Sequence, residues 1–134
     1  MEERRDAIRR PARALIAALA LGGAAEGCEL PQGARAESAS FALSFRLLPE
    51  RIALAEHFAL EYAICPKAGA ILPAMVSVDA WMPEHRHGMN YKASVAALGG
   101  GRFRAQGLLF HMPGRWEFVF EAGGERLAHS VRIE

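Results

Sequence analysis

The sequence has almost no excess of charge of either sign, and it has no apolar run long enough to cross a membrane. Its 16 Lys and Arg residues are balanced by 15 Asp and Glu residues, which leaves a formal net charge of +1. Nucleic-acid-binding domains usually carry a basic patch or a basic stripe. We therefore expect no nucleic-acid partner, and the length of 134 residues is typical of a single domain.

Aromatic side chains are missing from the first forty residues. That region instead has a basic start, with five arginines up to Arg13, followed by an uncharged run of twelve residues at 14–25. A helix of this length reaches only ~18 Å, whereas the hydrocarbon core of a bilayer is ~30 Å thick. A basic start, a short apolar run and small residues after it are the layout of a secretory signal peptide.

The end of this segment is compatible with three interpretations. Ala25 and Gly27 place small residues at the third and first positions before a cleavage site at Cys28. Gly27-Cys28 is also similar to the end of a lipoprotein signal, in which case a lipid on Cys28 would anchor the protein to a membrane. The third interpretation is a short buried helix. We predict that residues 1–27 are a signal peptide or lipoprotein signal, and that the protein is periplasmic or otherwise extracytoplasmic.

The remaining residues read as a tether followed by strands. Residues 28–39 are small and polar and include Pro31 and Gly33, which predicts a tether. From Phe41 the apolar residues alternate with polar ones, as in Phe41, Leu43 and Phe45. Six further runs follow, at residues 52–64, 74–82, 91–98, 102–110, 115–121 and 126–133.

The breaks between these runs carry proline and glycine, the residues typical of turns. In residues 116–120 the aromatic side chains fall on one face of the expected strand and Glu117 on the other. No stretch after residue 40 combines helical periodicity with caps, although residues 52–60 are ambiguous. About seven short strands in succession predict an all-β fold, an immunoglobulin-like antiparallel β-sandwich over residues 40–134.

Histidine and methionine are concentrated in one window of the predicted domain. Residues 82–112 hold three of the five histidines and three of the four methionines that follow Met1. They are Met82, His85, His87, Met89, His111 and Met112. In an extended chain, positions 85, 87 and 89 point to the same side, which would line up two imidazoles and a thioether. His111 and Met112, at the end of a later strand, would complete the site if the two strands are neighbours.

This mixed set of ligands favours copper. Imidazole is a borderline ligand and thioether a soft one, so Cu(I) is favoured where sulfur dominates, with Cu(II) as the alternative. Zinc sites generally use His, Cys and carboxylate instead of Met. The competing interpretation is packing, because methionine is an ordinary core filler and His111 would be a hydrogen-bonded core histidine. We expect His57 and His129, which have no such partners in the sequence, to be surface or framework residues.

The string from Asp79 to Asn90, together with Gly101-Arg102-Phe103, Gly107 and the string from Phe110 to Trp116, resembles the YtkA-like domain family. FixH-type proteins of oxidase assembly are related to that family. The resemblance covers residues 40–134 and implies an exported or membrane-anchored immunoglobulin-like sandwich with a role in copper handling. The segment is also similar to periplasmic Cu(I) chaperones of the PCuAC type, in which a methionine precedes a histidine by a set spacing. Twenty-one residues separate Met89 from His111 in the same way, although Met112 follows His111 directly.

Signatures of enzymes are missing. The sequence has no GxSxG elbow and no glycine-rich loop between a strand and a helix, so we expect no catalytic activity. Cys65 is a small hydrophobic residue by default. It could instead pair with Cys28 in an oxidising compartment, which lipidation of Cys28 would preclude, or bind copper.

The function expected from these features is that of an exported copper-binding protein. It would act as a metallochaperone or oxidase-assembly factor and pass copper to a membrane or periplasmic protein such as an oxidase. Trp81 and Trp116 would shield the bound ion. The alternative is an immunoglobulin-like accessory module without metal, in which the His/Met strip is a protein interface.

Overall fold

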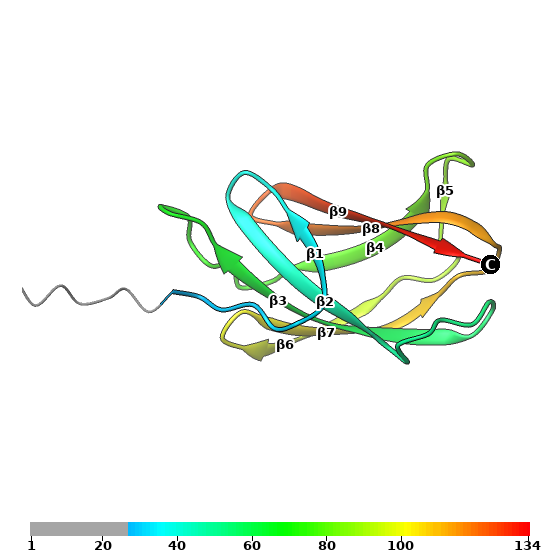
Figure 1. Ribbon diagram of the computed structural model, residues 1–134, viewed down its shortest axis with the longest axis horizontal. Helices are drawn as coiled ribbons and strands as arrows, with labels where there is room; N and C mark the ends of the chain where they lie inside the picture. The colour runs from blue at the N-terminus through cyan, green and yellow to red at the C-terminus, as the bar shows by residue number, and fades with distance from the viewer. Residues whose placement is uncertain (1–26) are drawn as a thin grey trace, which may run out of the picture.

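Two antiparallel β-sheets face each other in the computed structural model, which describes residues 27–134 (Figure 1). One sheet has the strand order β1-β2-β3-β7-β6, and the other has the order β5-β4-β8-β9. The strands are β1 (Ala34–Glu37), β2 (Phe41–Leu48), β3 (His57–Pro66), β4 (Ser77–Met82), β5 (His87–Gly88), β6 (Ser94–Gly99), β7 (Arg102–Leu109), β8 (Gly114–Ala122) and β9 (Glu125–Ile133). This architecture confirms the predicted β-sandwich. The described part of the chain contains no helix that could span a membrane.

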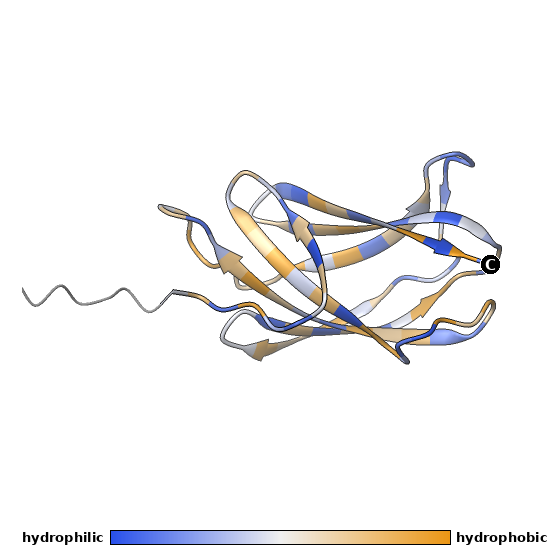
Figure 2. Cartoon of the chain, viewed as in Figure 1, coloured by the Kyte–Doolittle hydropathy of each residue, from blue (hydrophilic) through white to orange (hydrophobic). Residues whose placement is uncertain are grey.

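The two sheets pack through a core rich in aromatic rings. In β8, Trp116, Phe118 and Phe120 are fully buried, while Glu117 between them is partly exposed, as the alternation predicts. Phe45 of β2 crosses the sandwich to contact Phe118 and Phe120, with ring centres 5.4 and 5.3 Å apart. Figure 2 shows the alternation of apolar and polar residues along the strands. Aromatic pairs of this kind add about 0.5–1.5 kcal/mol each beyond the burial of their area, and they hold the sheets together.

Several predicted boundaries are wrong, most of all before β2 and before β3. Residues 28–39 are not a tether throughout, because β1 forms within them and pairs with β2, with Glu37 opposite Ala42. The turn between β1 and β2 is closed by the backbone N–H of Phe41, which donates to Ser38 Oγ at 3.2 Å. The strand predicted at 52–64 begins only at His57, after an irregular connection.

The strand before β2 was missed for a physical reason. Strand β1 is a short edge strand of small and polar residues, in which Ala36 is buried, so its apolar pattern is too weak to read. The short strand β5 was also not foreseen, and these two strands raise the count from about seven to nine. The predicted signal segment, residues 1–27, lies outside the described residues except for Gly27.

The sandwich has two distinct ends. The first described residues, the connection from β3 to β4 and the turn from β6 to β7 lie at one end, and β5 and the C-terminus lie at the other (Figure 1). Cys28 and Cys65 form a disulfide at the first end, with their Cα atoms 5.6 Å apart. This disulfide uses the sulfur that a lipid on Cys28 would need, and it favours pairing over both lipidation and copper binding by Cys65.

Candidate metal centre

His85 and His87 lie on a tight hairpin between β4 and β5. Residues 83–86 form a turn in which the backbone N–H groups of His85 and Arg86 both donate to the Met82 carbonyl, at 3.2 and 2.8 Å. Arg86 takes a left-handed backbone conformation, with φ of 55°. The predicted extended chain over residues 85–89 is therefore wrong, because His85 reaches His87 through a turn. The centres of the two imidazole rings are 5.8 Å apart.

Met82 is the predicted thioether ligand that lies opposite His87. The two residues are direct partners in the pairing of β4 with β5. Directly opposite residues of an antiparallel pair project to the same face, with Cβ atoms about 5 Å apart. Met82 is 1% exposed, so this face is the inner one. The sulfur of Met82 and the ring of His87 therefore lie on the core side of the hairpin.

His111 approaches this pair from the other sheet. Strands β5 and β7 belong to different sheets, so they are not neighbours through hydrogen bonds. His111 instead lies on the connection that leaves β7 and crosses to β8 at the same end of the sandwich. The centre of its ring is 5.2 Å from that of His87. His87 is thus the middle member of a row of three imidazoles.

Trp116 forms one wall of the site. Its ring lies 6.0 Å from His87 and 5.4 Å from His111, roughly perpendicular to both, with interplanar angles of 74° and 81°. The indole is fully buried and stacked on Phe110, and its N–H donates to the Met112 carbonyl at 3.0 Å. The side chain is therefore fixed, and it excludes water from the inner side of the two histidines.

The Nδ1 atom of His111 is buried without a hydrogen-bond partner. Buried polar atoms in proteins are almost always paired, and an unpaired one costs about 1–3 kcal/mol. The predicted alternative of a hydrogen-bonded core histidine is therefore not what the structure contains at this atom. An unprotonated imidazole nitrogen without a hydrogen-bond partner has a lone pair that can bind a metal ion.

The spacing of the rings is compatible with one shared ion. Two imidazoles bound to one tetrahedral ion at about 2.0 Å have ring centres about 5 Å apart, close to the His87–His111 separation. Within residues 27–134, however, no group of three or more His, Cys, Asp and Glu side chains is arranged to hold a metal ion. An ion bound here would therefore need a thioether in addition to imidazoles. That mixed donor set suits Cu(I).

The other two predicted methionines are held near the site by their backbones. The N–H of Met89, just after β5, donates to the Ala80 carbonyl at 3.2 Å. Met112 follows His111 and bonds Trp116 through its carbonyl, as described above. Both side chains are partly buried against the core. We therefore rank Met82 first among the thioethers, with Met89 and Met112 as further candidates.

Trp81 does not lie beside Trp116. Successive residues of a strand alternate between faces, so Trp81 points away from the face that carries Met82. Its indole N–H donates to Glu117 at 3.3 Å on the outer side of the sheet. Of the two tryptophans predicted to shield the site, Trp116 is the one whose ring lies against the rings of His87 and His111.

Besides the pairing of β4 with β8, the hairpin meets β8 at two further places. Arg115 Nε donates to Glu84 Oε1 at 3.1 Å. Gly114 has φ of 130°, and a Cβ atom there would lie 2.7 Å from Cε of Met82. In the sequence, Gly114 lies in the break between the runs at 102–110 and 115–121, where a turn is expected. Its second role, leaving room for the Met82 methyl group, has no signal in the sequence because the two residues are far apart along the chain.

No protein-family model, curated protein or solved structure matches the chain.

His57 and His129 are not members of the row of histidines, although His57 pairs with Leu109 of β7, two residues before His111. His57 packs its ring against Tyr91, with centres 5.1 Å apart. His129 Nδ1 is 2.8 Å from the Arg35 carbonyl, and its ring contacts Phe45. Both have structural partners, which makes them suitable control positions.

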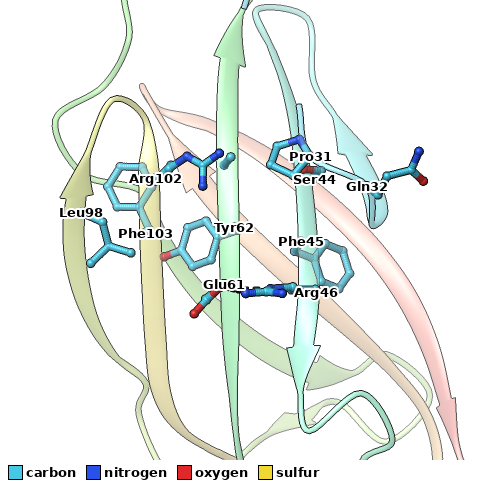
Figure 3. A pocket seen from close by; sticks show the side chains of 11 residues that line it. Pro31, Gln32, Ser44, Phe45, Arg46, Glu61, Tyr62, Leu98, Arg102 and Phe103 are labelled. Carbon is cyan, nitrogen blue, oxygen red and sulfur yellow. Dashed lines mark hydrogen bonds and ion pairs between the residues drawn. The ribbon is translucent and has the colours of Figure 1, made fainter. Parts of the chain in front are cut away.

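A separate hollow lies on the five-stranded sheet and holds none of the predicted ligands. It has a volume of about 370 Å³ and is lined by residues that include Arg46, Glu61, Arg102 and Leu98 (Figure 3). Glu61 is bonded by Arg46 and, at 2.8 Å, by Arg104. The hydrogen bond from Arg46 holds the pKa of the Glu61 carboxyl below its usual range, with a further contribution from the charge of Arg104. The hollow's only carboxylate is thus already paired.

Proposed function

We propose that this protein binds copper as cargo, in the Cu(I) state, and passes it to another protein. The observation that carries the proposal is the buried, unpartnered Nδ1 of His111, on a ring 5.2 Å from that of His87. Met82, opposite His87, adds a soft sulfur ligand to the two imidazoles. Imidazole and thioether together match the preference of Cu(I) for soft ligands.

The exposure of the ligands supports exchange of the cargo. Met82 is buried, His87 and His111 are partly buried, and His85 is exposed on the turn. An acceptor protein could therefore approach His85 and replace ligands from the solvent side, while Trp116 keeps water from the inner side. This gradient suits a metallochaperone better than a permanent structural site, since structural metal sites are closed by their ligands.

Export from the cytoplasm is part of the same proposal. The disulfide between Cys28 and Cys65 suits the periplasm or another oxidising compartment, where such bonds persist. The basic start and apolar run of residues 1–27 provide the corresponding signal. The acceptor would be a membrane or periplasmic protein such as an oxidase.

The test is a competition for Cu(I) between the protein and a chromogenic chelator under anaerobic conditions. We expect one equivalent to bind tightly, and His87→Ala and His111→Ala each to weaken binding by about 10- to 100-fold, because each removes a ligand. His57→Ala and His129→Ala are matched controls, and their affinity should stay at the wild-type value. Copper that stays on the chelator, or equal affinity in all four variants, would overturn the proposal.

A second candidate is an interaction module that binds no metal. It is favoured by the finding that residues 27–134 contain no group of three or more His, Cys, Asp and Glu side chains arranged around an ion. In that case the histidine row is a protein contact surface. Apo protein that stays apo under copper loading, together with loss of partner capture in His85→Ala, would support this candidate.

A further inference from the structure

The connection between β3 and β4 is unusually apolar for an exposed loop. Residues 68–78 contain no charged side chain. Ile71 is 86% exposed, and Leu72 and Met75 are 41% and 51% exposed, within five residues of one another. Large apolar side chains clustered in this way on a surface mark a site of interaction with a protein or a membrane.

Parts of this loop, residues 67–76, are held in place by contacts within the loop and with the rest of the fold. The Ala70 N–H donates to the Lys67 carbonyl at 3.0 Å. A Cβ atom at Gly101, in the turn between β6 and β7, would lie 3.2 Å from Cδ1 of Leu72. Val76, at the far end of the loop, is fully buried. The base of the loop is therefore anchored while Ile71 projects into solvent.

The disulfide ties the loop to the apolar run near the N-terminus. Cys65 lies just before the loop, and its Cα is 5.6 Å from that of Cys28. The uncharged run of residues 14–25 ends only three residues before Cys28. Three residues span at most ~10 Å even when fully extended. Whatever surface the run occupies, the base of the loop must lie close to it.

We propose that the apolar run stays on the chain after export, and that residues 67–76 form a membrane-contacting tip, which inserts Ile71, Leu72 and Met75 into a lipid surface beside that run. A run of twelve apolar residues is too short to span a bilayer and partitions to its surface, where further apolar side chains add to binding. The tip lies at the end of the sandwich opposite β5 (Figure 1). Docking there would point the histidine row away from the membrane. This inference does not depend on copper binding.

The test is hydrogen exchange of the full chain with and without vesicles of phosphatidylethanolamine and phosphatidylglycerol. We expect the amides of residues 67–76 to gain protection on vesicles, and those of residues 83–90, at the opposite end, to be unchanged. Replacing Ile71, Leu72 and Met75 together with glutamine should lower vesicle partitioning by about tenfold. Ile71→Gln alone serves if the triple variant is unstable, and should remove a part of this effect.

Leu54→Gln is the matched control, because Leu54 is an exposed apolar residue near the histidine end, where the Ala55 N–H donates to the Phe110 carbonyl. It should partition like the wild type. Vesicle binding without protection of the amides of residues 67–76 would overturn the proposal, since the N-terminal apolar run would then bind the vesicles without the tip. Protection that appears without vesicles and rises with protein concentration would also overturn it, by assigning the tip to contact between copies of the chain.

Discussion

At the scale of single residues, the candidate centre ranks the three predicted methionine ligands differently from the sequence. Met82 is opposite His87 in a strand pair, whereas Met89 and Met112 lie outside the strands. The sequence ranks Met89 above Met82, because Met89 continues the alternation of His85 and His87. The turn at residues 83–86 breaks that alternation, and local spacing could not reveal it.

Replacing Met82 with leucine should therefore weaken Cu(I) binding by about tenfold or more, whereas Met89→Leu should have a smaller effect. Leucine keeps the volume and the burial of methionine, so Met82→Leu should cost less than about 1.5 kcal/mol in stability. Competition with a chelator measures the affinity, and urea unfolding measures the stability. A larger loss in Met89→Leu would show that the sequence ranked the thioethers correctly.

His111 should make the apo protein less stable than a purely apolar side chain would. Its buried Nδ1 lacks a partner, so His111→Phe should stabilise the apo protein by about 1 kcal/mol while it removes copper binding. The comparison of urea midpoints of the two apo proteins measures the first effect. His57→Phe is the control and should not be more stable than the wild type. If His111→Phe were less stable than the wild type, Nδ1 of His111 would have a hydrogen-bond partner in the apo protein.

At the scale of elements, the hairpin of β4 and β5 depends on one unusual backbone position. Arg86 has φ of 55°, and its N–H bonds the Met82 carbonyl. Proline cannot adopt this φ and has no N–H, while glycine adopts it freely.

Arg86→Pro should therefore disrupt the turn and lower copper affinity about as strongly as loss of His87, whereas Arg86→Gly should bind like the wild type. The cost of the proline should be about 3 kcal/mol, and the rest of the sandwich should stay folded by circular dichroism. Equal affinity in the two variants would mean that the geometry of the turn does not matter to the site. Both substitutions remove the positive charge of Arg86, so the comparison isolates the effect of the backbone conformation on copper affinity.

A row of charges crosses three strands on the outer face of the other sheet. Glu61 of β3 lies opposite Arg46 of β2 and Arg104 of β7. These arginines lower the pKa of the Glu61 carboxyl in the folded state. A lowered folded pKa means that the charged carboxylate stabilises the fold above the unfolded pKa, and that this contribution is lost as the pH falls through the folded value.

Glu61→Gln should accordingly lower stability at neutral pH by no more than about 1 kcal/mol, since the pair is exposed to solvent and screened. The difference from the wild type should shrink below about pH 4, where the carboxylate of the wild type becomes protonated. Urea unfolding across a pH series measures it. Glu56→Gln is the control, because Glu56 makes no ion pair within residues 27–134. If the stability difference between the wild type and Glu61→Gln grew as the pH fell, the lowered pKa of the Glu61 carboxyl would be contradicted.

The elements also show how far a sequence alone predicts this molecule. The burial of Trp116, Phe118 and Phe120 follows from strict alternation, and long strands such as β8 and β9 carry a clear signal. Strand β1 has small residues, and β5 has only two, so each depends on its partner strand instead of its own pattern. The meeting of His87 with His111 is set by packing between two sheets, which no local spacing encodes.

At the scale of the whole molecule, the disulfide and the histidine row lie at opposite ends of the sandwich (Figure 1). The disulfide closes a loop between residues separated by 37 positions, and it ties the segment before β1 to the end of β3. A cross-link over a loop of this length contributes about 4 kcal/mol by restricting the unfolded chain. The packed core and strands such as β3 (His57–Pro66) lie between these two ends.

Replacing both Cys28 and Cys65 with alanine should therefore lower Tm by more than about 10 °C and leave Cu(I) affinity within about twofold of the wild type. Alanine is preferable to chemical reduction because free thiols would themselves bind Cu(I) and mask the result. Calorimetry measures Tm, and chelator competition below the lowered Tm measures affinity. A loss of affinity as large as that of His111→Ala would mean that the two ends are coupled, or that a cysteine belongs to the copper site. An unchanged Tm would mean that the cross-link does not restrain the unfolded chain.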